Sequence, residues 1–326
     1  MLALEWIGQQ AVLAIGSTGE RRPIDPVLVG LLARLGEWAA REELRQEGID
    51  ISVDSLDTLV QLGVLETSPG ENRATACGWH PFDLDVLQIQ SIGGVAPRTK
   101  PPPPPFRPAF EGRRIELPRG ALPAMTLAEA LSRRRSLRRY GARPLSLADV
   151  GVLLEHAARV VAIQTDSNLG EIVYRPYAAA GARSELELYV MANRIEHVVP
   201  GLYHYEAREH RMIHIRAHDK GGAALNAWLN DAMGQTRKGE PQLVLVIAAV
   251  LERLFWKYGR FGLTLAYQDV GCLYQTLYLL ATALGLSPCA VGAGRARETA
   301  KWLGVDELTE TPIGYFVVGV PEADLA

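Results

Sequence analysis

The sequence has no cysteine pattern that could build a metal site or a disulfide framework. Its three cysteines, Cys77, Cys272 and Cys289, show no CxxC spacing and lie in apolar surroundings. An excess of charge is also missing, because 34 basic residues face 37 acidic ones and the formal net charge is -3. That balance excludes a general attraction to nucleic acid or anionic lipid. We expect reduced, buried thiols, no metal, and a local site for any anion.

Targeting and repeat signals are missing as well. The first residues, MLALEWIGQQAVLAIG, are mildly apolar, but Glu5 interrupts them and no basic stretch precedes them. This predicts neither a signal peptide nor a membrane span, so the expected location is the cytoplasm. No GxGxxG follows an expected strand, which excludes a Rossmann fingerprint, and no internal repeat is present.

The composition is typical of a soluble globular protein, and the length favours more than one domain. Hydrophobic residues make up 48% and charged residues 22% of the 326 residues. The run Pro101–Pro105 cannot join a helix or an interior strand and favours extended structure. We therefore expect a small N-terminal domain over residues 1–100, a proline-rich linker over 101–120 and a large domain over 121–326.

The N-terminal domain is predicted to be helical and similar in pattern to a winged helix. Residues 25–66 contain three short runs with apolar residues three and four apart. The third run carries Asp54, Asp57 and Glu66 and no lysine or arginine, which disfavours contact with DNA phosphates. A peptide-binding or docking module and a plain structural appendage both remain open.

The large domain is predicted to be α+β, a mixed sheet wrapped by helices. Apolar, β-branched runs predict strands, and a nearly all-apolar run closed by Gly285 predicts a long helix buried in the domain or at a subunit interface. Thr126 with Glu129 forms a capping box, and Ser146 with Asp149 starts a second helix. The strands are expected at Leu186–Ala192, Leu243–Ala249 and Ile313–Val320, and the long helix at Leu263–Leu284.

A dense positive cluster follows the first of these helices. Arg134, Arg135, Ser136, Arg138 and Arg139 lie within six positions of a chain that is net acidic. Arginine side chains offer bidentate, charge-assisted hydrogen bonds to phosphate, and the serine adds a hydroxyl. The cluster predicts an anion site, with a solvated basic helix end as the alternative.

The cluster RRSLRRY resembles the RRSxRxF/Y motif of the nitroreductase superfamily, which grips the phosphate of FMN. The resemblance implies that Arg134, Ser136 and Arg138 contact the phosphate, with Arg135 beside them. RPYAAAGARSELELYV, residues 175–190, resembles a stretch of SagB-type dehydrogenases whose backbone passes along the flavin ring. This implies flavin contacts from Ala179, Ala180, Gly181 and Ala182. Ala178, Ala179 and Glu185 depart from that pattern, where proline, serine and proline are expected.

Two further segments extend the resemblance. PGLYHYEAREHRMIHI, residues 200–215, matches a family segment, and its histidines His204, His210 and His214 are expected half-exposed on a β-hairpin rather than on a metal. Cys289–Ala296 resembles a loop that closes over FMN, which implies cofactor contacts from Gly292, Gly294, Arg295 and Arg297. Cys272 is expected to be a small buried side chain within the long helix.

Lys257 and Tyr258 resemble the lysine–tyrosine pair with which azoline dehydrogenases remove a proton. Converting a thiazoline or oxazoline to an aromatic azole sends a hydride to flavin and a proton to a base. Lys257 would be that base, and Tyr258 would relay the proton or orient the lysine. An exposed loop pair without a catalytic role is the alternative.

The resemblance, over residues 117–321, implies a dimeric FMN enzyme with its cofactor between subunits. The implied reaction is oxidation of a peptide-borne or carrier-bound azoline in natural-product biosynthesis, with oxygen as electron acceptor and a cyclodehydratase or peptide synthetase as candidate partner. Two alternatives stay open: an NAD(P)H-dependent nitro- or quinone-reductase of the same fold, and a non-catalytic subunit that binds a leader peptide as a scaffold.

Overall fold

The computed structural model describes residues 2–7, 10–15, 20–24, 100–234 and 238–322. The chain divides into two compact units, Met1–Gly93 and Gly94–Ala326. In the first unit a three-stranded antiparallel sheet, which the sequence analysis did not predict, has the order β1 (Leu2–Ile7), β2 (Gln10–Ile15), β3 (Glu20–Ile24). The predicted helices over 25–66 and Cys77 lie outside the described residues.

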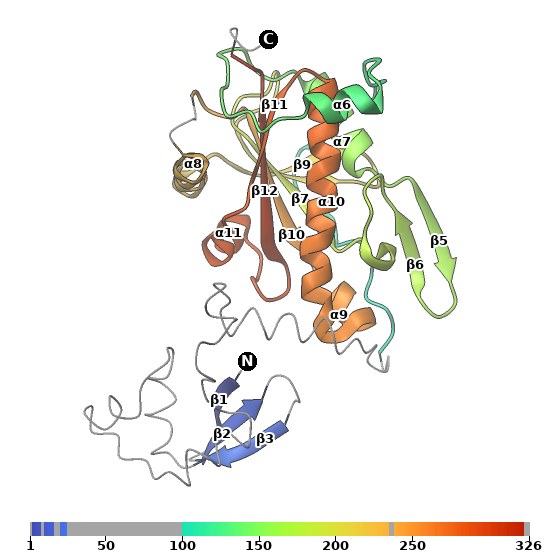
Figure 1. Ribbon diagram of the computed structural model, residues 1–326, viewed down its shortest axis with the longest axis vertical. Coiled ribbons are helices and arrows are strands. Elements are labelled where there is room, and N and C mark those ends of the chain that lie inside the picture. The colour runs from blue at the N-terminus through green and yellow to red at the C-terminus, as the bar shows by residue number, and fades with distance from the viewer. Residues whose placement is uncertain (1, 8–9, 16–19, 25–99, 235–237, 323–326) are drawn as a thin grey trace, which may run out of the picture. The chain divides into compact units, whose positions relative to one another are not determined.

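The second unit is built on a seven-stranded sheet of order β11-β12-β10-β7-β8-β9-β4 (Figure 1). Its paired strands run antiparallel, and isolated parallel bridges join Arg139 to Lys238 and Leu145 to Ile195. The α+β prediction is confirmed. The strands are β4 (Arg114–Glu116), β7 (Leu186–Ala192), β8 (Gly201–Glu206), β9 (Arg211–Ala217), β10 (Leu243–Ala249), β11 (Ser287–Val291) and β12 (Thr311–Gly319).

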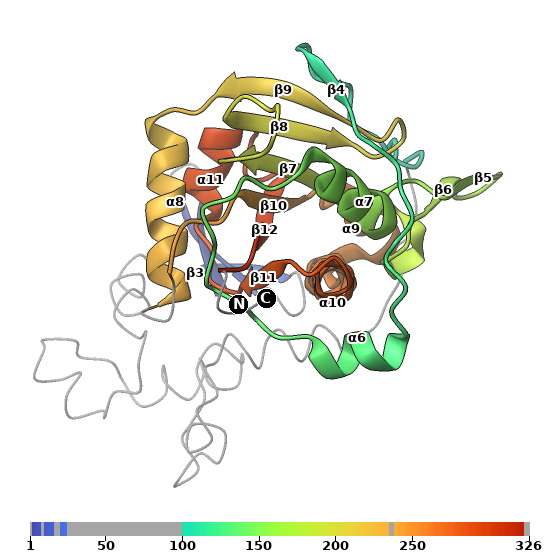
Figure 2. The same cartoon turned by 90° about the horizontal axis from the view of Figure 1, so that it is seen from above.

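Helices cover both faces of this sheet, which explains why the central strand β10 is apolar at every position (Figure 2). Successive strand side chains point to opposite faces. In β10, Leu245 and Ile247 therefore pack with α7 and α10, while Val244 and Val246 pack with α8 and α11. The helices are α6 (Leu127–Arg133), α7 (Leu147–Ala158), α8 (Lys220–Met233), α9 (Glu252–Tyr258), α10 (Gly262–Ala283) and α11 (Ala296–Leu303).

The predicted helix starts are confirmed by their hydrogen bonds. Thr126 and Glu129 form the full capping box of α6, and the Ser146 side chain accepts the Asp149 N–H at the start of α7. The strands β7 and β10 have the predicted bounds, and β12 begins two residues earlier than predicted.

The long helix α10 matches its prediction in length and in its ending, where Gly285 adopts a left-handed φ of 66°. Two of its tyrosines, one turn apart, fix it to the sheet by accepting backbone N–H groups: Tyr274 from Tyr315 and Tyr278 from Ala290. Several residues of the same helix are exposed, among them Leu263, Tyr267 and Cys272.

The predicted burial of Cys272 is wrong, because this side chain is exposed on α10, whereas Cys289 is buried as expected. In the first two turns of the same helix, Leu263 is 38% and Tyr267 57% exposed. An apolar run of helical length does not reveal which of its sides faces the sheet.

The predicted hairpin of histidines is present as β8 and β9, but two of the three are buried rather than half-exposed. His204 hydrogen-bonds Glu187 through Nε2, at 3.1 Å, and His210 hydrogen-bonds the Tyr205 hydroxyl through Nδ1, at 2.9 Å. Alternation of residues along a strand indicates which side chains share a face of the sheet, but it does not show whether polar partners bury that face.

The proline-rich segment lies along the second unit and is held there by hydrogen bonds. The Trp256 indole N–H donates to the Lys100 carbonyl at 2.7 Å, and Arg253 Nε donates to the Pro104 carbonyl at 3.0 Å. Farther along the segment, β4 joins the sheet beside β9. Residues 100–116 thus belong to the structure of this unit, and their role as a link between domains stays a prediction.

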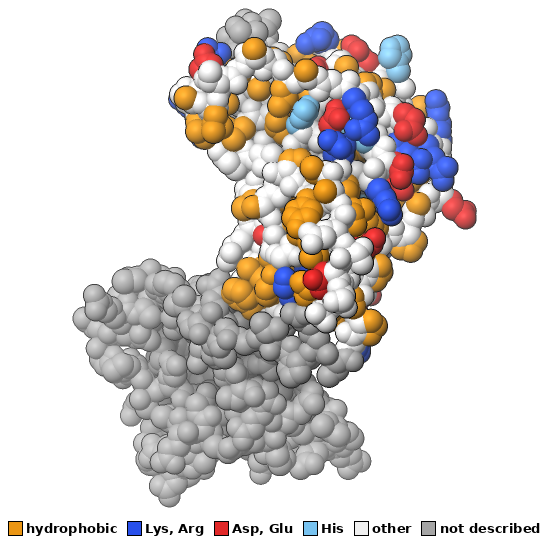
Figure 3. All heavy atoms as spheres, turned by 90° about the vertical axis from the view of Figure 1, so that its right-hand side faces the viewer, with side chains coloured by type: hydrophobic (Ala, Val, Ile, Leu, Met, Phe, Trp, Pro, Cys, Tyr) orange, Lys and Arg blue, Asp and Glu red, His pale blue; other side chains and the backbone are white. Residues whose placement is uncertain are grey.

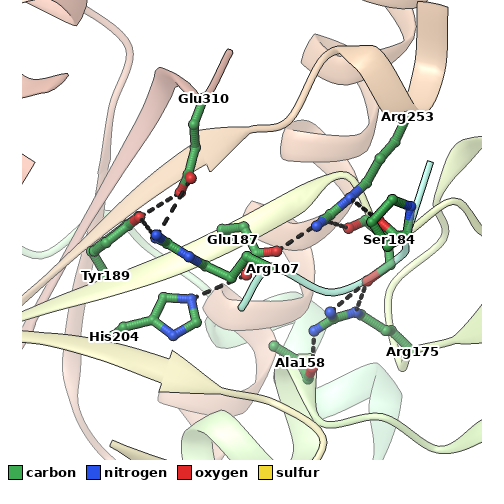
Figure 4. Close-up of polar contacts among 10 residues, drawn as sticks. Arg107, Ala158, Arg175, Ser184, Glu187, Tyr189, His204, Arg253 and Glu310 are labelled. Carbon is green, nitrogen blue, oxygen red and sulfur yellow. Dashed lines mark hydrogen bonds and ion pairs between the residues drawn. The ribbon is translucent and has the colours of Figure 1, made fainter. Parts of the chain in front are cut away.

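The buried guanidinium of Arg253 joins several parts of this unit (Figure 4). Besides Pro104, it donates to the Ser184 carbonyl at 2.5 Å and to Glu187 Oε1 at 2.8 Å. Burial by itself would raise the pKa of Glu187, but the hydrogen bond from His204 and the charge of Arg253 outweigh it and bring this pKa to about 2. The ion pair therefore fixes the position of α9 relative to β7.

Replacing Arg253 with methionine should destabilise the protein by about 3–5 kcal/mol, because it leaves the Glu187 carboxylate buried without its cation. Urea unfolding measures the change. Arg297→Ala is the matched control: its ion pair with Glu307 is exposed and is worth less than about 1 kcal/mol. Equal losses in the two variants would contradict a structural role for the buried pair.

Candidate active site

An arginine cradle, defined as Arg134, Ser136 and Arg138, lies in the extended segment after α6. These alternate residues share one side of the chain and face α10 and β11. The Arg134 guanidinium lies 5.3 Å from the centre of the Tyr278 ring, Ser136 Oγ lies 2.8 Å from the Tyr278 hydroxyl, and Arg138 contacts Cys289. Arg135, predicted with them, is exposed and donates to the Ser132 and Arg134 carbonyls.

The cradle fits an anion such as a phosphate. Among the described residues no carboxylate pairs with Arg134 or Arg138, and Arg138 Nε is buried without a hydrogen-bond partner. The Tyr278 hydroxyl accepts the Ala290 N–H, so it can donate its own proton to Ser136 Oγ. The Ser136 proton is then available for an anion, as are the guanidinium N–H groups.

The loop before β7, predicted to follow the flavin ring, has an unusual backbone. Gly181, Ala182 and Ser184 adopt left-handed φ values of 59°, 52° and 57°. Such a conformation is unfavourable for residues with a Cβ and is found at functional sites where surrounding contacts enforce it. Here Arg175 does so by donating to the Ser184 hydroxyl, at 2.6 Å from Nη2, and to the Ala158 carbonyl, at 2.8 Å from Nη1.

The same loop lies directly against the predicted catalytic pair. Lys257 and Tyr258 are the last two residues of α9, both half-buried, so they are not an exposed loop pair. A Cβ placed on Gly181 would overlap Lys257 Nζ and the Tyr258 hydroxyl. Glycine at this position therefore allows the close approach that joins two motifs 76 positions apart.

The helix α10 connects this loop to the arginine cradle. Ala180 donates its N–H to Asp269 Oδ2 at 2.8 Å, and the cradle contacts Tyr278 nine residues farther along α10. Nine residues of α-helix span about 13 Å. Figure 1 shows α9 at one end of α10 and α6 near the other. A ligand with an anionic group at one end and a planar ring at the other can reach both places along the helix.

Of the remaining predicted cofactor residues, Gly292, Gly294 and Arg295 lie between β11 and α11, and Arg297 lies in the first turn of α11. Gly292 and Gly294 are exposed, and a Cβ on Gly292 would meet nothing within 4 Å, so folding alone does not require glycine there. Arg295 lies 6.0 Å from the centre of the Trp228 ring, and Arg297 is paired with Glu307. In these positions neither arginine contacts the cradle, and their cofactor roles stay predictions.

Three residues near the site were not predicted from the sequence. They are Tyr278, Arg253 and Glu185, whose carboxyl group contacts that of Asp269 on α10. The spacing of Tyr274 and Tyr278, one helical turn apart in an apolar helix, was the available signal for the first. For the other two, the contacts are between distant segments and left no local pattern.

The fold and the family match define the class of flavoprotein oxidoreductases with a nitroreductase-like α+β fold. The chain belongs to the nitroreductase family, whose sequence profile matches residues 131–320. A protein of Methanocaldococcus jannaschii described as a nitroreductase is 32% identical over 202 residues, which make up 61% of this chain and 95% of that protein.

Two solved structures show the same fold. One from Ralstonia eutropha, described as a nitroreductase, is 24% identical, with 71% of this chain and 99% of that chain covered and a TM-score of 0.52. One from Anabaena variabilis is 19% identical with 65% of this chain covered and a TM-score of 0.50, and the match spans only 42% of that chain. A weaker likeness links this chain to a chain of the E. coli microcin synthetase McbBCD complex with truncated pro-MccB17, which is 20% identical, with 91% of this chain and 94% of that chain covered and a TM-score of 0.48.

No described helix is long and apolar enough to cross a membrane. No group of three or more histidine, cysteine, aspartate or glutamate side chains among the described residues could hold a metal ion.

Replacing Gly181 with alanine should cost roughly 1–2 kcal/mol for the left-handed backbone and should also displace Lys257 and Tyr258. Gly285→Ala is the control, because Gly285 has a similar φ and open space around its Cβ position. Urea unfolding measures the stability loss, and chemical acetylation followed by mass spectrometry measures the reactivity of the Lys257 amine. Changed lysine reactivity is expected in the first variant alone; unchanged reactivity in both would mean that the loop does not touch the lysine.

Proposed function

We propose that this protein is an FMN-dependent dehydrogenase that oxidises a peptide-borne thiazoline or oxazoline to the azole. The observation that carries the proposal is the contact of the Gly181 backbone with Lys257 and Tyr258. A base next to a flavin-binding loop suits a substrate that must lose a proton together with a hydride. Reduction of a nitro group or a quinone needs no base of this kind.

FMN would be held at two places. Its phosphate would bind the cradle of Arg134, Ser136 and Arg138, and its ring would lie along the half-buried loop Ala179–Ala182, with Gly292 and Gly294 near the opposite side. When bound, FMN supplies a hydride acceptor that oxygen can then reoxidise. The loop's small side chains suit close approach of a planar ring to the backbone.

The chain's own residues would carry the proton. Lys257 Nζ accepts the proton from the azoline carbon, and Tyr258, whose ring centre lies 5.2 Å from Nζ, orients the amine and relays the proton toward solvent. Because Arg253 holds α9 to Ser184 and Pro104, the pair is carried by a fixed helix end rather than by a free loop.

The proposed enzyme is a homodimer that acts on a peptide, with a cyclodehydratase or peptide synthetase as the partner supplying it. Leu263 and Tyr267 in the first two turns of α10, and the neighbouring Phe255 on α9, are exposed and give an apolar surface that a second copy would cover. Figure 3 shows hydrophobic side chains gathered on the middle of one face of this unit. The first unit would serve as the peptide-binding or docking module.

Arg138→Ala should weaken FMN binding by about 10- to 100-fold, as expected for loss of a charge-assisted hydrogen bond worth about 1.5–3 kcal/mol. Quenching of FMN fluorescence on titration with apoprotein measures the affinity. Arg133→Ala, in the last turn of α6 and exposed, is the control and should leave affinity within about twofold. Similar losses in both variants would indicate a general charge effect instead of a cradle.

Lys257→Ala should retain FMN and lose about 100- to 10,000-fold in turnover of a peptide thiazoline, the usual contribution of a positioned base. Mass spectrometry detects the loss of two hydrogen atoms from the peptide, and the exposed Lys301→Ala is the control. Retained turnover would move the base elsewhere. Rapid bleaching of the flavin by NADPH with untouched thiazoline would favour a nitro- or quinone-reductase, and purified protein without flavin absorbance would favour a scaffold.

A further inference from the structure

Two buried carboxyl groups face each other behind the flavin loop. Glu185, just before β7, has no exposed surface, and neither of its carboxyl oxygens receives a hydrogen bond from an N–H or O–H donor among the described residues. The group that it meets is the carboxyl of Asp269 on α10, which is also buried. Two carboxyl groups in this arrangement form a stable contact when one of them carries a proton and donates it to the other.

No lysine or arginine among the described residues forms an ion pair with Glu185 or Asp269. The charge of Arg175 lowers the pKa of Glu185, but its donors go to Ser184 and to the Ala158 carbonyl. Tyr177 is buried and has a raised pKa, to which burial contributes most and the charges of Glu185 and Asp269 add, whereas the ionised Glu187 on β7 is paired with Arg253 and His204. Burial raises the pKa of Glu185 to about 8, and the adjacent Asp269 adds to this shift. At neutral pH a proton therefore remains in the pair.

The pair is attached to the parts of the site that must stay together. Asp269 Oδ2 accepts the N–H of Ala180, the residue before Gly181, at 2.8 Å. The Glu185 carbonyl accepts the N–H of Val250 at 2.8 Å, in the turn between β10 and α9. The two carboxyl groups thus join the flavin loop, α10 and the entry to the helix that carries Lys257.

We infer that Glu185 and Asp269 share one proton and that this protonated pair is a positioning element, which holds the loop Ala179–Ala182 against Lys257 and Tyr258. Loss of the proton in alkaline solution leaves two adjacent carboxylates, which repel each other and loosen the Ala180 contact. The contacts of the carboxyl pair follow from the geometry of the chain, whereas its effect on FMN binding rests on the proposed function.

The first test is the pH dependence of unfolding of the apoprotein. The folded protein keeps a proton that an unfolded glutamate loses above about pH 4.5, so this contribution to stability falls as the pH rises from about 4.5 to about 8. The unfolding constant of the wild type should increase by up to about tenfold per pH unit relative to that of Glu185→Gln, whose amide donates to Asp269 at every pH. Coinciding pH profiles would overturn the inference.

Glu155→Gln is the matched control. Burial raises the pKa of Glu155, but hydrogen bonds from the Gly120 N–H and from Arg119 outweigh it and keep this pKa below the ordinary value, so its removal leaves the slope above pH 5 unchanged. If Glu185→Gln fails to fold, Asp269→Asn replaces it, because its amide can donate to Glu185 while its oxygen still accepts from Ala180. A carboxylic-acid C=O band in the infrared spectrum of the wild type, absent from either variant, gives an independent readout; its absence from the wild type would sink the idea.

The second test measures FMN affinity at pH 7 and pH 9. The wild type should bind about tenfold more weakly at pH 9, and Glu185→Gln should bind equally at both. Equal weakening in both proteins would show that the pair does not hold the loop. If neither protein binds FMN at any pH, the proposed function fails, while the unfolding profiles still decide whether the pair shares a proton.

Discussion

At Gly181 the chain has no side chain where the loop before β7 meets the end of α9, and any Cβ there would overlap Lys257 and Tyr258. The rest of the site is arranged around this contact. Arg175 holds the loop from one side, and the Ala180 N–H holds it to α10. From the other side, Arg253 holds α9 to the residue that ends the loop. A left-handed backbone that would be unfavourable alone is thereby maintained by hydrogen bonds from separate elements.

Arg253 differs from Arg134 and Arg138 in the groups that it contacts. Arg253 is buried and paired with Glu187, and it also satisfies two backbone carbonyls, which identifies it as structural. Arg134 and Arg138 have no carboxylate partner among the described residues, although Arg138 is partly buried. Removing charge from water without compensation is costly, so cations in this state indicate an external anion. Whether an arginine is structural or free to bind an anion depends on the groups that it contacts in the fold, and the density of positive charge in a sequence does not show these contacts.

Much of the fold could be predicted because local chemistry and tertiary environment agree. The strand β10 is apolar and β7 is buried at every position since helices cover both faces, and the caps at Thr126 and Ser146 are formed by residues three positions apart. The predictions that failed depended on long-range packing, namely the exposure of Cys272 and the burial of His204. The attachment of the proline-rich segment through Arg253 also depends on such packing and had no signal in the sequence. The motifs of the site were found singly. Their meeting at Gly181, and the carboxyl pair behind it, come from the topology.

The proposed function requires that a base on α9 acts beside a flavin held by the loop and that the protein takes hydrogen from an azoline. Anaerobic mixing of the FMN-loaded protein with a peptide thiazoline in a stopped-flow spectrophotometer tests this most directly, because no nicotinamide is present. If the proposed function is correct, the flavin absorbance is bleached and one azole forms per flavin reduced. A flavin that stays oxidised with the thiazoline, and bleaches only when NADPH is added, would contradict it.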